Sequence, residues 1–251
     1  MPISVVLITR NAGSQLDDCL ASAAFAEDTV VVDSGSVDGT RDIARRRGAR
    51  VVEHEWIGFG PQKQYAVNLA AHDWVLCLDA DERVSDALRE SIVRELQAPR
   101  AHAYLISRRN RFLGRWLRHG EGYPDRSLRF FHRRHARWSD DPVHERVITL
   151  EPVERLKGDL LHYSAETLDR YLDKQNRYTR LQAERLHAQG RMAGWPHLVF
   201  SPLLRFVKFY FFRLGFLDGL PGLIHIGIGC MNSFHKYAKL IEMNSQTGTR
   251  P

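Results

Sequence analysis

The sequence predicts an α/β fold in which a mostly parallel central sheet is flanked by helices and followed by a C-terminal helical appendage. Short apolar runs alternate with amphipathic segments through the first hundred residues, which is the pattern of successive β-α-β units. Several of these runs end in small or acidic residues, as strands do where they reach the loops at a sheet edge. The last hundred residues instead carry long aromatic and aliphatic stretches with helical spacing.

The expected elements of the first part follow one another at short intervals. Strands are expected at residues 1–10, 29–32, 50–54, 74–78 and 103–107. Helices are expected at residues 14–24, 41–47, 62–71 and 86–97, the last with Ser85 as its N-cap. Residues 108–150 show a mixed pattern, which we interpret as the far edge of the sheet. Right-handed crossovers between the parallel strands place helices on both faces.

Two domains are expected. Residues 1–150 form the predicted catalytic domain, and residues 151–251 form a helical extension that begins with an amphipathic helix at 168–186. Residues 203–217 intersperse basic residues among large apolar ones, which is typical of a helix lying in a membrane interface. Charges exclude this segment as a membrane span, and the uncharged stretch at 219–235 is too short. Packing on the main domain and contact with an anionic membrane surface are both compatible with this pattern.

Composition and charge limit the cellular compartments and the kinds of partner that fit this protein. The chain has a formal net charge of +6, and ten arginines fall between Arg108 and Arg137, which suits an anionic partner or a solvated basic face. Its three cysteines are too far apart for a zinc site or a disulfide framework, which indicates a reducing, cytoplasmic location. The first ten residues lack the basic region and apolar length of a signal peptide, so we expect them to form a strand.

The sharpest motif is the segment 74–82, in which an apolar run ends in three carboxylates. Asp79 and Asp81 alternate as side chains do in a strand, so both can face one side and bind a hard divalent cation. A plain turn or helix start is the other interpretation of the same residues. Polar groups also follow the first strand at Thr9 and the second at 33–38. Because parallel strands end at one edge, we expect these groups to share a cleft.

Three stretches together resemble family 2 glycosyltransferases, whose nucleotide-sugar-binding fold is called GT-A. They are residues 4–11 (SVVLITRN), 31–40 (VVDSGSVDGT) and 78–82 (LDADE). Residues 122–124 (GYP), 128–133 (LRFFHR) and 143–145 (VHE) further resemble the subgroup that adds glucose, through a β-1,4 linkage, to the heptose of the lipopolysaccharide inner core. With these, the resemblance extends over most of the chain.

The resemblance implies an inverting, metal-dependent glycosyltransferase. It would move a hexose, glucose in this subgroup, from UDP-glucose to a lipopolysaccharide-core or other surface-glycan acceptor. The implied cofactor is Mg²⁺ or Mn²⁺, and the implied acceptor is lipid-linked or phosphorylated. The enzyme would then be a peripheral protein at the inner face of the cytoplasmic membrane, with no nucleic-acid partner.

The resemblance also assigns roles to single residues. Asp33 would accept hydrogen bonds from the nucleotide base, Asp79 would face the ribose or metal-bound water, and Asp81 would bind the metal at the diphosphate. The metal ligands are thus Asp81 and Asp79 of the Asp-x-Asp motif. The set expected to contact the nucleotide sugar is Thr9, Arg10, Asn11, Asp33, Gly35, Asp38, Lys63, Asp79 and Ala80. For Lys63, a solvated helix residue is the alternative interpretation.

Inversion by direct displacement needs a carboxylate that takes the proton of the acceptor hydroxyl. We expect Glu145 to be this base, with Asp141 as the next candidate, and an ordinary surface acid is the alternative interpretation of Glu145. His144 would contact the diphosphate or the metal, or serve as a structural residue. The glutamine-arginine-tryptophan acceptor motif of many family members is not found in this chain, which disfavours a processive polymerase.

Three rival functions fit less of the sequence. A phosphatase of the haloacid dehalogenase type needs threonine or valine where Arg83 stands. A nucleotidyltransferase is closer in fold but usually has a glycine-rich basic loop after the first strand, and residues 9–13 do not form one. A non-enzymatic basic protein that binds anionic surfaces accounts for the charge but not for the acidic cleft.

Overall fold

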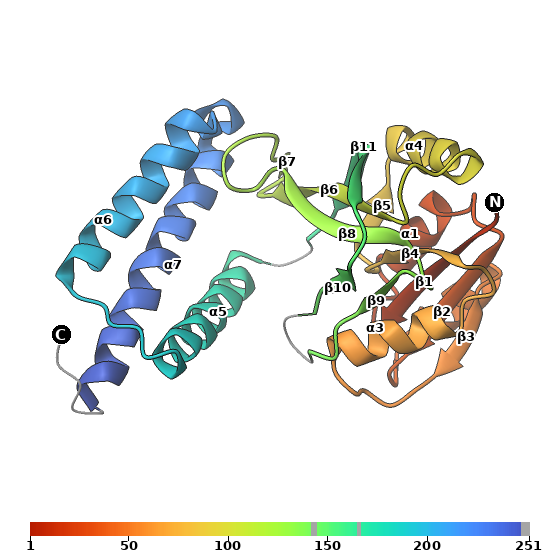
Figure 1. The fold of residues 1–251 in the computed structure, drawn as a ribbon, viewed down its shortest axis with the longest axis horizontal. Helices are drawn as coiled ribbons and strands as arrows, with labels where there is room; N and C mark the ends of the chain where they lie inside the picture. Colours follow the sequence, from red (N-terminus) through yellow and green to blue (C-terminus); the bar gives the residue numbers. More distant parts are fainter. Residues whose placement is uncertain (142–144, 165–166, 247–251) are drawn as a thin grey trace. The chain divides into compact units, whose positions relative to one another are not determined.

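The chain forms two compact units (Figure 1). The structure is a computed structural model that describes residues 1–141, 145–164 and 167–246. One unit comprises residues 1–109 and 125–163, and the other residues 110–124 with the helical segment from 164 onward. A boundary at residue 150 was expected from the sequence. The first unit instead continues to Tyr163, because residues 153–162 form a strand of its sheet.

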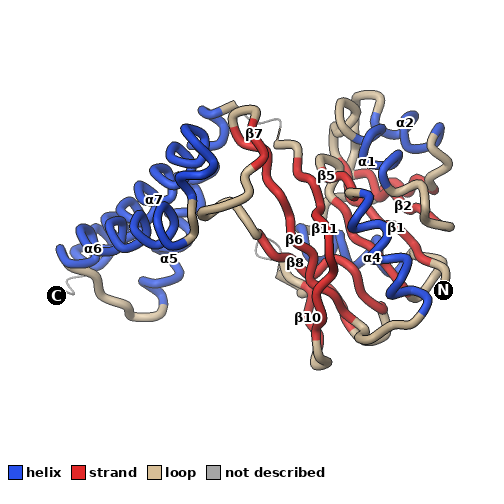
Figure 2. Tube along the Cα trace, turned by 90° about the horizontal axis from the view of Figure 1, so that it is seen from above, coloured by secondary structure: helices blue, strands red, loops and turns tan. Residues whose placement is uncertain are grey.

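The first unit is built on a sheet with the strand order β3-β2-β1-β4-β8-β6-β11-β5 (Figure 2). Its strands are β1 (Ile3–Thr9), β2 (Asp28–Asp33), β3 (Arg50–Glu53), β4 (Trp74–Leu78), β5 (Glu82–Val84), β6 (Ala103–Phe112), β8 (Asp125–His132) and β11 (Val153–His162). Strand β1 pairs in parallel with β2 and β4, and β2 with β3, as predicted. The far edge of the sheet is antiparallel. Strand β8 pairs antiparallel with β4 and with β6, and β11 pairs antiparallel with β5. The predicted α/β class is confirmed.

Alternation along the strands builds a core on each face of this sheet. In β4, Trp74, Leu76 and Leu78 belong to one core, and Val75 and Cys77 to the other. Helices cover both faces: α1 (Leu16–Ser22), α2 (Thr40–Arg46) and α4 (Asp86–Gln97) contribute to the first core, and α3 (Phe59–Asn68) to the second. Burial on both faces explains why the β4 run is apolar without interruption.

Local signals set the helix boundaries. The Ser85 hydroxyl accepts a hydrogen bond from the Leu88 amide at 3.3 Å and caps α4, as predicted. Helix α3 begins at Phe59, three residues earlier than expected. The residue before it, Gly58, has φ of 103°, a backbone conformation that favours glycine and lets the chain turn directly into the helix.

The first unit also contains a short two-stranded hairpin. Strands β9 (Ala136–Trp138) and β10 (Val147–Thr149) pair antiparallel, with Trp138 opposite Val147. Trp138 is buried in the second core. The hairpin therefore packs against the sheet through Trp138.

The second unit is helical, with a short strand β7 (Arg115–Trp116) that pairs with the end of β6. It contains α5 (Leu168–Ala188), α6 (Trp195–Phe206), a π-helical turn (Val207–Phe212), a 3₁₀ turn (Gly215–Asp218) and α7 (Gly219–Gln246). The single helix expected at 203–217 is wrong. The chain breaks at Leu214, which has a left-handed backbone with φ of 54°, and it bends there before α7.

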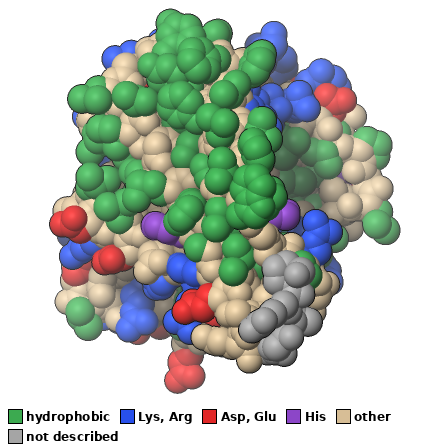
Figure 3. Space-filling model, turned by 90° about the vertical axis from the view of Figure 1, so that its left-hand side faces the viewer, with side chains coloured by type: hydrophobic (Ala, Val, Ile, Leu, Met, Phe, Trp, Pro, Cys, Tyr) green, Lys and Arg blue, Asp and Glu red, His purple; other side chains and the backbone are tan. Residues whose placement is uncertain are grey.

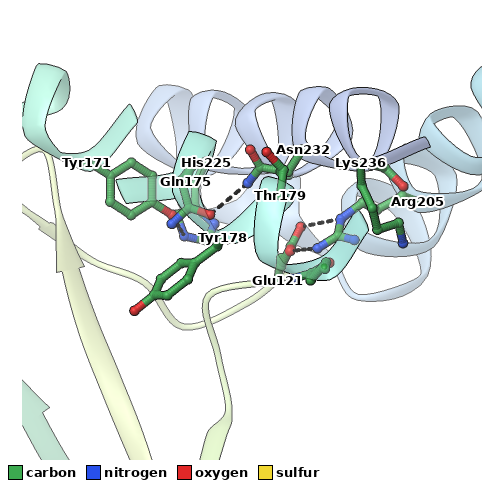
Figure 4. Close-up of a pocket in the computed structure, with 12 residues that line it drawn as sticks. Glu121, Tyr171, Gln175, Tyr178, Thr179, Arg205, His225, Asn232 and Lys236 are labelled. Carbon is green, nitrogen blue, oxygen red and sulfur yellow. Dashed lines mark hydrogen bonds and ion pairs between the residues drawn. The ribbon is translucent and has the colours of Figure 1, made fainter. Parts of the chain in front are cut away.

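The second unit contains a polar pocket of about 130 Å³ between its helices (Figure 4). Arg205 of α6 forms an ion pair with Glu121, and Asn232 of α7 donates a hydrogen bond to Gln175 of α5 at 2.8 Å. Gly229 lies against the ion pair, because a Cβ at this position would overlap the Glu121 carboxylate. This partly buried polar contact links the segment 110–124 to the helices.

Among the described residues, no single helix is both long and apolar enough to cross a membrane. Two helical stretches, Trp195–Phe212 and Gly215–Gln246, meet the length and composition requirement only as a pair, and they are bent by 74° at the break between them.

Candidate functional site

Three of the predicted polar clusters lie at the same edge of the sheet. Thr9 at the end of β1 is in register with Asp33 at the end of β2. On its other side, β1 pairs with β4 so that Leu7 is opposite Leu78, the residue before Asp79. The parallel arrangement thus brings these sequence-distant groups to one edge, as expected.

Asp33 organises the first part of this edge. Its carboxylate is fully buried and accepts hydrogen bonds from the Thr9 hydroxyl at 3.0 Å, and from the Ser36 amide at 2.8 Å and hydroxyl at 2.5 Å. The nearest cation is Arg41, with its Nε 4.0 Å away. Hydrogen bonds of this kind stabilise a buried carboxylate and here tie the loop after β1 to the loop after β2.

The loops joined by Asp33 present an exposed rim. Asn11 has φ of 53°, its amide donates to the Ser36 hydroxyl at 2.8 Å, and its side chain accepts from the Val37 amide at 2.9 Å. Asp38 accepts from the Gly13 amide at 3.0 Å, and the Thr40 hydroxyl holds its pKa below the usual value. Both Asn11 and Asp38 are exposed, as are the predicted binding residues Arg10 and Gly35.

The second part of the edge is a chain of opposite charges. The Lys63 ammonium lies 3.1 Å from Asp79 Oδ1 and 3.0 Å from Glu145 Oε1. Arg129, which the sequence did not single out, bonds the other oxygen of Asp79 at 2.7 Å. Burial opposes ionisation of Asp79, but the charges of Arg129 and Lys63 prevail and hold its pKa below the usual value.

An aromatic ring supports both cations. The Lys63 nitrogen lies 4.8 Å and the Arg129 guanidinium carbon 5.5 Å from the ring of Trp138. The indole nitrogen donates to Cys77 at 3.3 Å, which fixes the ring over β4. A pocket of about 260 Å³ opens beside this group, lined by Arg126, Ser127, Leu128, Arg129, Trp138, Glu145, Arg146 and Val147.

Glu82 has a structural role beneath the cations. Its side chain is fully buried, accepts from the Asp79 amide at 2.9 Å, and lies 3.6 Å from Arg108 and 3.7 Å from Arg129. Burial raises its pKa, although the charge of Arg129 acts against the increase. The third acid of the motif therefore positions the loop that carries Asp79.

Asp81 has a partner that the sequence did not indicate. Its Oδ2 lies 3.0 Å from Nε2 of His162, at the end of β11, and its side chain is 37% exposed. The Tyr163 amide also donates to the Asp81 carbonyl at 2.8 Å. A carboxylate oxygen and an imidazole nitrogen thus face each other at an accessible position. His162 lies in an ordinary strand sequence with no motif around it, so only the pairing of β11 with β5 brings it here.

Of the two other residues predicted near Glu145, the structure describes Asp141 but not His144. Asp141 is exposed, and its backbone carbonyl accepts from the Gly60 amide at 3.3 Å. A Cβ on Gly60 would overlap the carbonyls of Ser139 and Asp141, so glycine is needed for this approach. His144 lies outside the described residues.

The arginine-rich stretch does not form one free basic face. Among the residues that the structure describes, at least six of its ten arginines form ion pairs with acids, namely Arg108, Arg109, Arg129, Arg133, Arg134 and Arg137. Arg133 and Arg134 share Asp73, for example, and Arg109 pairs with Asp159. Much of the positive charge in this stretch therefore has a partner within the first unit.

Comparison with known proteins identifies the family. The model of the family described as glycosyl transferase family 2 matches residues 4–154 of this chain, more than half of its length. The chain belongs to glycosyltransferase family 2. This glycosyltransferase is 28% identical over 253 residues to a lipopolysaccharide core biosynthesis glycosyltransferase of Rhizobium meliloti (strain 1021), and the match covers 98% of this chain and 94% of that protein. An uncharacterized glycosyltransferase of Rickettsia typhi is also 28% identical, over 96% of this chain and 87% of its own.

A solved structure shows the same fold as this glycosyltransferase. The crystal structure of S. aureus TarS residues 1–349 in complex with UDP-GlcNAc superimposes with a TM-score of 0.50 at 14% identity, covering 99% of this chain and 92% of that one. The GT-A fold expected from the sequence is confirmed.

Proposed function

We propose that this family 2 glycosyltransferase is an inverting enzyme that transfers glucose from UDP-glucose to a lipopolysaccharide-core or other surface-glycan acceptor. The family and the full-length relative that acts in lipopolysaccharide core biosynthesis support this proposal. The observation that carries it is the convergence of Lys63, Asp79 and Glu145 beside a pocket at the carboxyl edge of the sheet. Lys63 can contact a diphosphate at one side, and Glu145 can accept a hydrogen bond from an acceptor hydroxyl at the other.

In this proposal the nucleotide binds along the rim formed by the loops after β1 and β2. Arg10, Asn11 and Gly35 are exposed there and can meet the base and ribose. Asp33 was expected to bond the base directly. Because its carboxylate is buried and already accepts hydrogen bonds from Thr9 and Ser36, we propose that it holds the two base-binding loops in place.

The residues around Asp81 fit a divalent cation. Asp81 and His162 offer an oxygen and a nitrogen at an accessible point, and this mixed ligand pair suits Mn²⁺ better than Mg²⁺. Asp79 shares its carboxylate between Lys63 and Arg129, so we assign it to the ribose or to metal-bound water. When bound, the cation would supply positive charge that stabilises the departing nucleoside diphosphate.

Glu145 is the proposed base. Its carboxylate is 20% exposed and lines the pocket, where an acceptor hydroxyl can donate to it. Lys63 orients Glu145 through an ion pair at 3.0 Å and keeps it next to Asp79, so the base is placed beside the donor site. The acceptor oxygen loses its proton to Glu145 as it bonds to the anomeric carbon, and the diphosphate leaves from the opposite face.

The test is a screen of purified protein with different nucleotide sugars and Mg²⁺ or Mn²⁺, followed by Glu145→Gln. Release of UDP from UDP-glucose should exceed that from other donors. Glu145→Gln should lower transfer by a factor of about 10²–10⁴ while the donor still binds, because only proton removal is lost. Normal transfer by this variant would refute Glu145 as the base, and Asp141→Asn would then be measured.

We also propose that the second unit contacts the anionic inner surface of the cytoplasmic membrane, where a lipid-linked acceptor lies. Large apolar side chains are exposed on its helices, namely Trp195, Phe200, Leu203, Leu204, Phe211, Phe212, Phe216, Leu217, Leu220 and Leu223. Figure 3 shows hydrophobic side chains gathered on this face. Exposed Lys208 and Arg213 flank the segment 209–212, which contains Phe211 and Phe212, a composition typical of interfacial helices.

A further inference from the structure

Three side chains with metal-binding atoms meet at the end of the sheet opposite to Asp79. His102 lies directly before β6, His135 lies between β8 and β9, and Glu151 follows β10. The pairing of β8 with β4 shows which end of the sheet this is. His132, the last residue of β8, pairs with Trp74 at the start of β4, whereas Asp79 follows the end of β4. The group is therefore separate from the donor site.

The geometry of the group is convergent. Nδ1 of His135 lies 2.5 Å from one oxygen of Glu151, and Nδ1 of His102 bonds the other oxygen. The two imidazole rings stack with centroids 3.8 Å apart and planes 5° from parallel, and the contact of both Nδ1 atoms with one carboxylate places these atoms on the same side. One potential ligand atom from each residue lies within 4.8 Å of the others.

Neighbouring contacts fix this geometry. The Thr149 hydroxyl donates to the His135 carbonyl at 2.9 Å and accepts from the Glu151 amide at 3.1 Å, so the segments carrying two of the three residues are joined. The three side chains are 34–44% exposed, which leaves a path for an ion from solvent.

We propose that His102, His135 and Glu151 form a binding site for a divalent transition-metal ion of the zinc class. Two imidazole nitrogens and one carboxylate oxygen are a common zinc ligand set, with water in the fourth position. The ion would lie where both Nδ1 atoms now contact the Glu151 carboxylate. Each neutral imidazole then carries its proton on Nε2 and offers the Nδ1 lone pair to the metal.

The site stabilises the hairpin that leads to the proposed base. His135 precedes β9 and Glu151 follows β10, so both lie at the open end of the hairpin, while Glu145 lies on the side of its connecting segment. His102 belongs to the main sheet, where its carbonyl accepts from the His132 amide at 2.8 Å. A bound ion would therefore join the hairpin to the sheet, independently of donor chemistry.

The test is titration of the chelator-treated, full-length protein with ZnCl₂ by calorimetry, followed by Co²⁺ absorption spectroscopy. We expect a saturable site that is retained in Asp81→Asn, a higher melting temperature with Zn²⁺, and the visible absorption of tetrahedral Co²⁺. His135→Gln and Glu151→Gln should each weaken Zn²⁺ binding at least tenfold. His235→Gln, in the second unit, is the matched control and should bind as the wild type does.

Asp81→Asn separates this site from the proposed donor metal, because it should bind Zn²⁺ unchanged. Circular dichroism verifies that each variant is folded, and His102→Gln serves as a further ligand variant if one of the others is not. Absence of saturable Zn²⁺ binding, or binding that survives His135→Gln and Glu151→Gln in folded protein, overturns the proposal. A loss of melting temperature in these variants without any Zn²⁺ binding by the wild type would make the cluster a hydrogen-bonded clamp only, which also overturns it.

Discussion

Lys63 illustrates how a single residue acquires its role from tertiary contacts. From the sequence it was either a solvated helix residue or a cation for the phosphates. Only 6% of it is exposed, and its ammonium bridges Asp79 and Glu145 above the ring of Trp138. A buried charge is stable only with partners of opposite charge, so Lys63 and the two acids each stabilise the charged form of the other. The solvated interpretation is thereby excluded, while contact with phosphate stays a prediction.

Asp81 and His162 give a prediction for metal use at the residue scale. Asp81→Asn should abolish transfer, because the substitution removes the charged ligand of the proposed cation. His162→Gln should retain some transfer with Mg²⁺ but lose the preference for Mn²⁺ that an imidazole ligand confers. Activity measured against the concentration of each ion checks both effects. Wild-type activity in the presence of excess chelator would contradict the metal-dependent mechanism.

Gly229 gives a stability prediction with a built-in control. Alanine at this position would overlap the Glu121 carboxylate and crowd its ion pair with Arg205, which should cost about 1–3 kcal/mol. The better helix propensity of alanine offsets about 1 kcal/mol of that. Gly227→Ala meets no atom within 4 Å and should stabilise instead. Urea unfolding of both variants is the measurement, and equal stabilisation by the two would contradict this packing.

At the scale of elements, the strand ends determine the site. The apolar runs of β1, β2 and β4 were recognisable because central parallel strands are buried on both faces. Their order in the sheet then follows from crossovers, and the polar residues after each strand meet at one edge. The hairpin β9–β10 and strand β11 were missed, since they are short or carry charges at their exposed positions.

Asp28 ties several elements together and predicts a pH effect. At the start of β2, it accepts hydrogen bonds from Ser4 of β1 at 2.7 Å and the Ala71 amide at 2.9 Å, and it pairs with Arg50 of β3. Burial opposes ionisation, but these hydrogen bonds prevail and lower its pKa below the usual value. Its folded pKa is thus below its unfolded one, so the stabilisation is present above about pH 4 and is lost as pH falls through the folded pKa.

Asp28→Asn should therefore lower the free energy of unfolding at pH 7 by about 1.5–3 kcal/mol, the range for a hydrogen bond to a charged group. The difference from the wild type should shrink as the pH falls below about 4. Urea denaturation at a series of pH values measures it. Asp42→Asn removes only an exposed ion pair with Arg45 and should change stability by less than about 1 kcal/mol. A difference for Asp28→Asn that does not vary with pH would contradict this assignment.

At the scale of the whole molecule, the chain combines a catalytic unit with a helical unit of different surface chemistry. The first unit pairs most of its arginines with acids, whereas the second exposes aromatic and aliphatic side chains on its helices. Apolar faces of this kind mark interaction sites. Arg205, which the sequence suggested as a lipid contact, is engaged with Glu121 instead, so Lys208 and Arg213 are the basic residues to test there.

Liposome flotation tests the membrane proposal. The wild type should bind vesicles containing anionic lipid, and Phe211→Ser with Phe212→Ser should weaken binding by about 3 kcal/mol or more, because two exposed phenylalanines no longer enter the interface. Val37→Ser with Leu150→Ser removes exposed apolar side chains from the first unit and is the control, with binding unchanged. Equal flotation of all three proteins would refute this surface as the contact.

The sequence by itself determined the α/β class, the parallel strands and the acidic ends of β2 and β4. The spacing of apolar residues and the residue types found in loops both depend only on neighbouring positions in the chain. Tertiary structure alone decided the partners: Arg129 and Glu145 on either side of the Asp79–Lys63 pair, His162 beside Asp81, and the burial of Asp33. These contacts join residues from 24 to 82 positions apart. A periodic pattern in the sequence does not predict contacts between residues so far apart, because strand pairing and the packing of side chains at the sheet edge determine them.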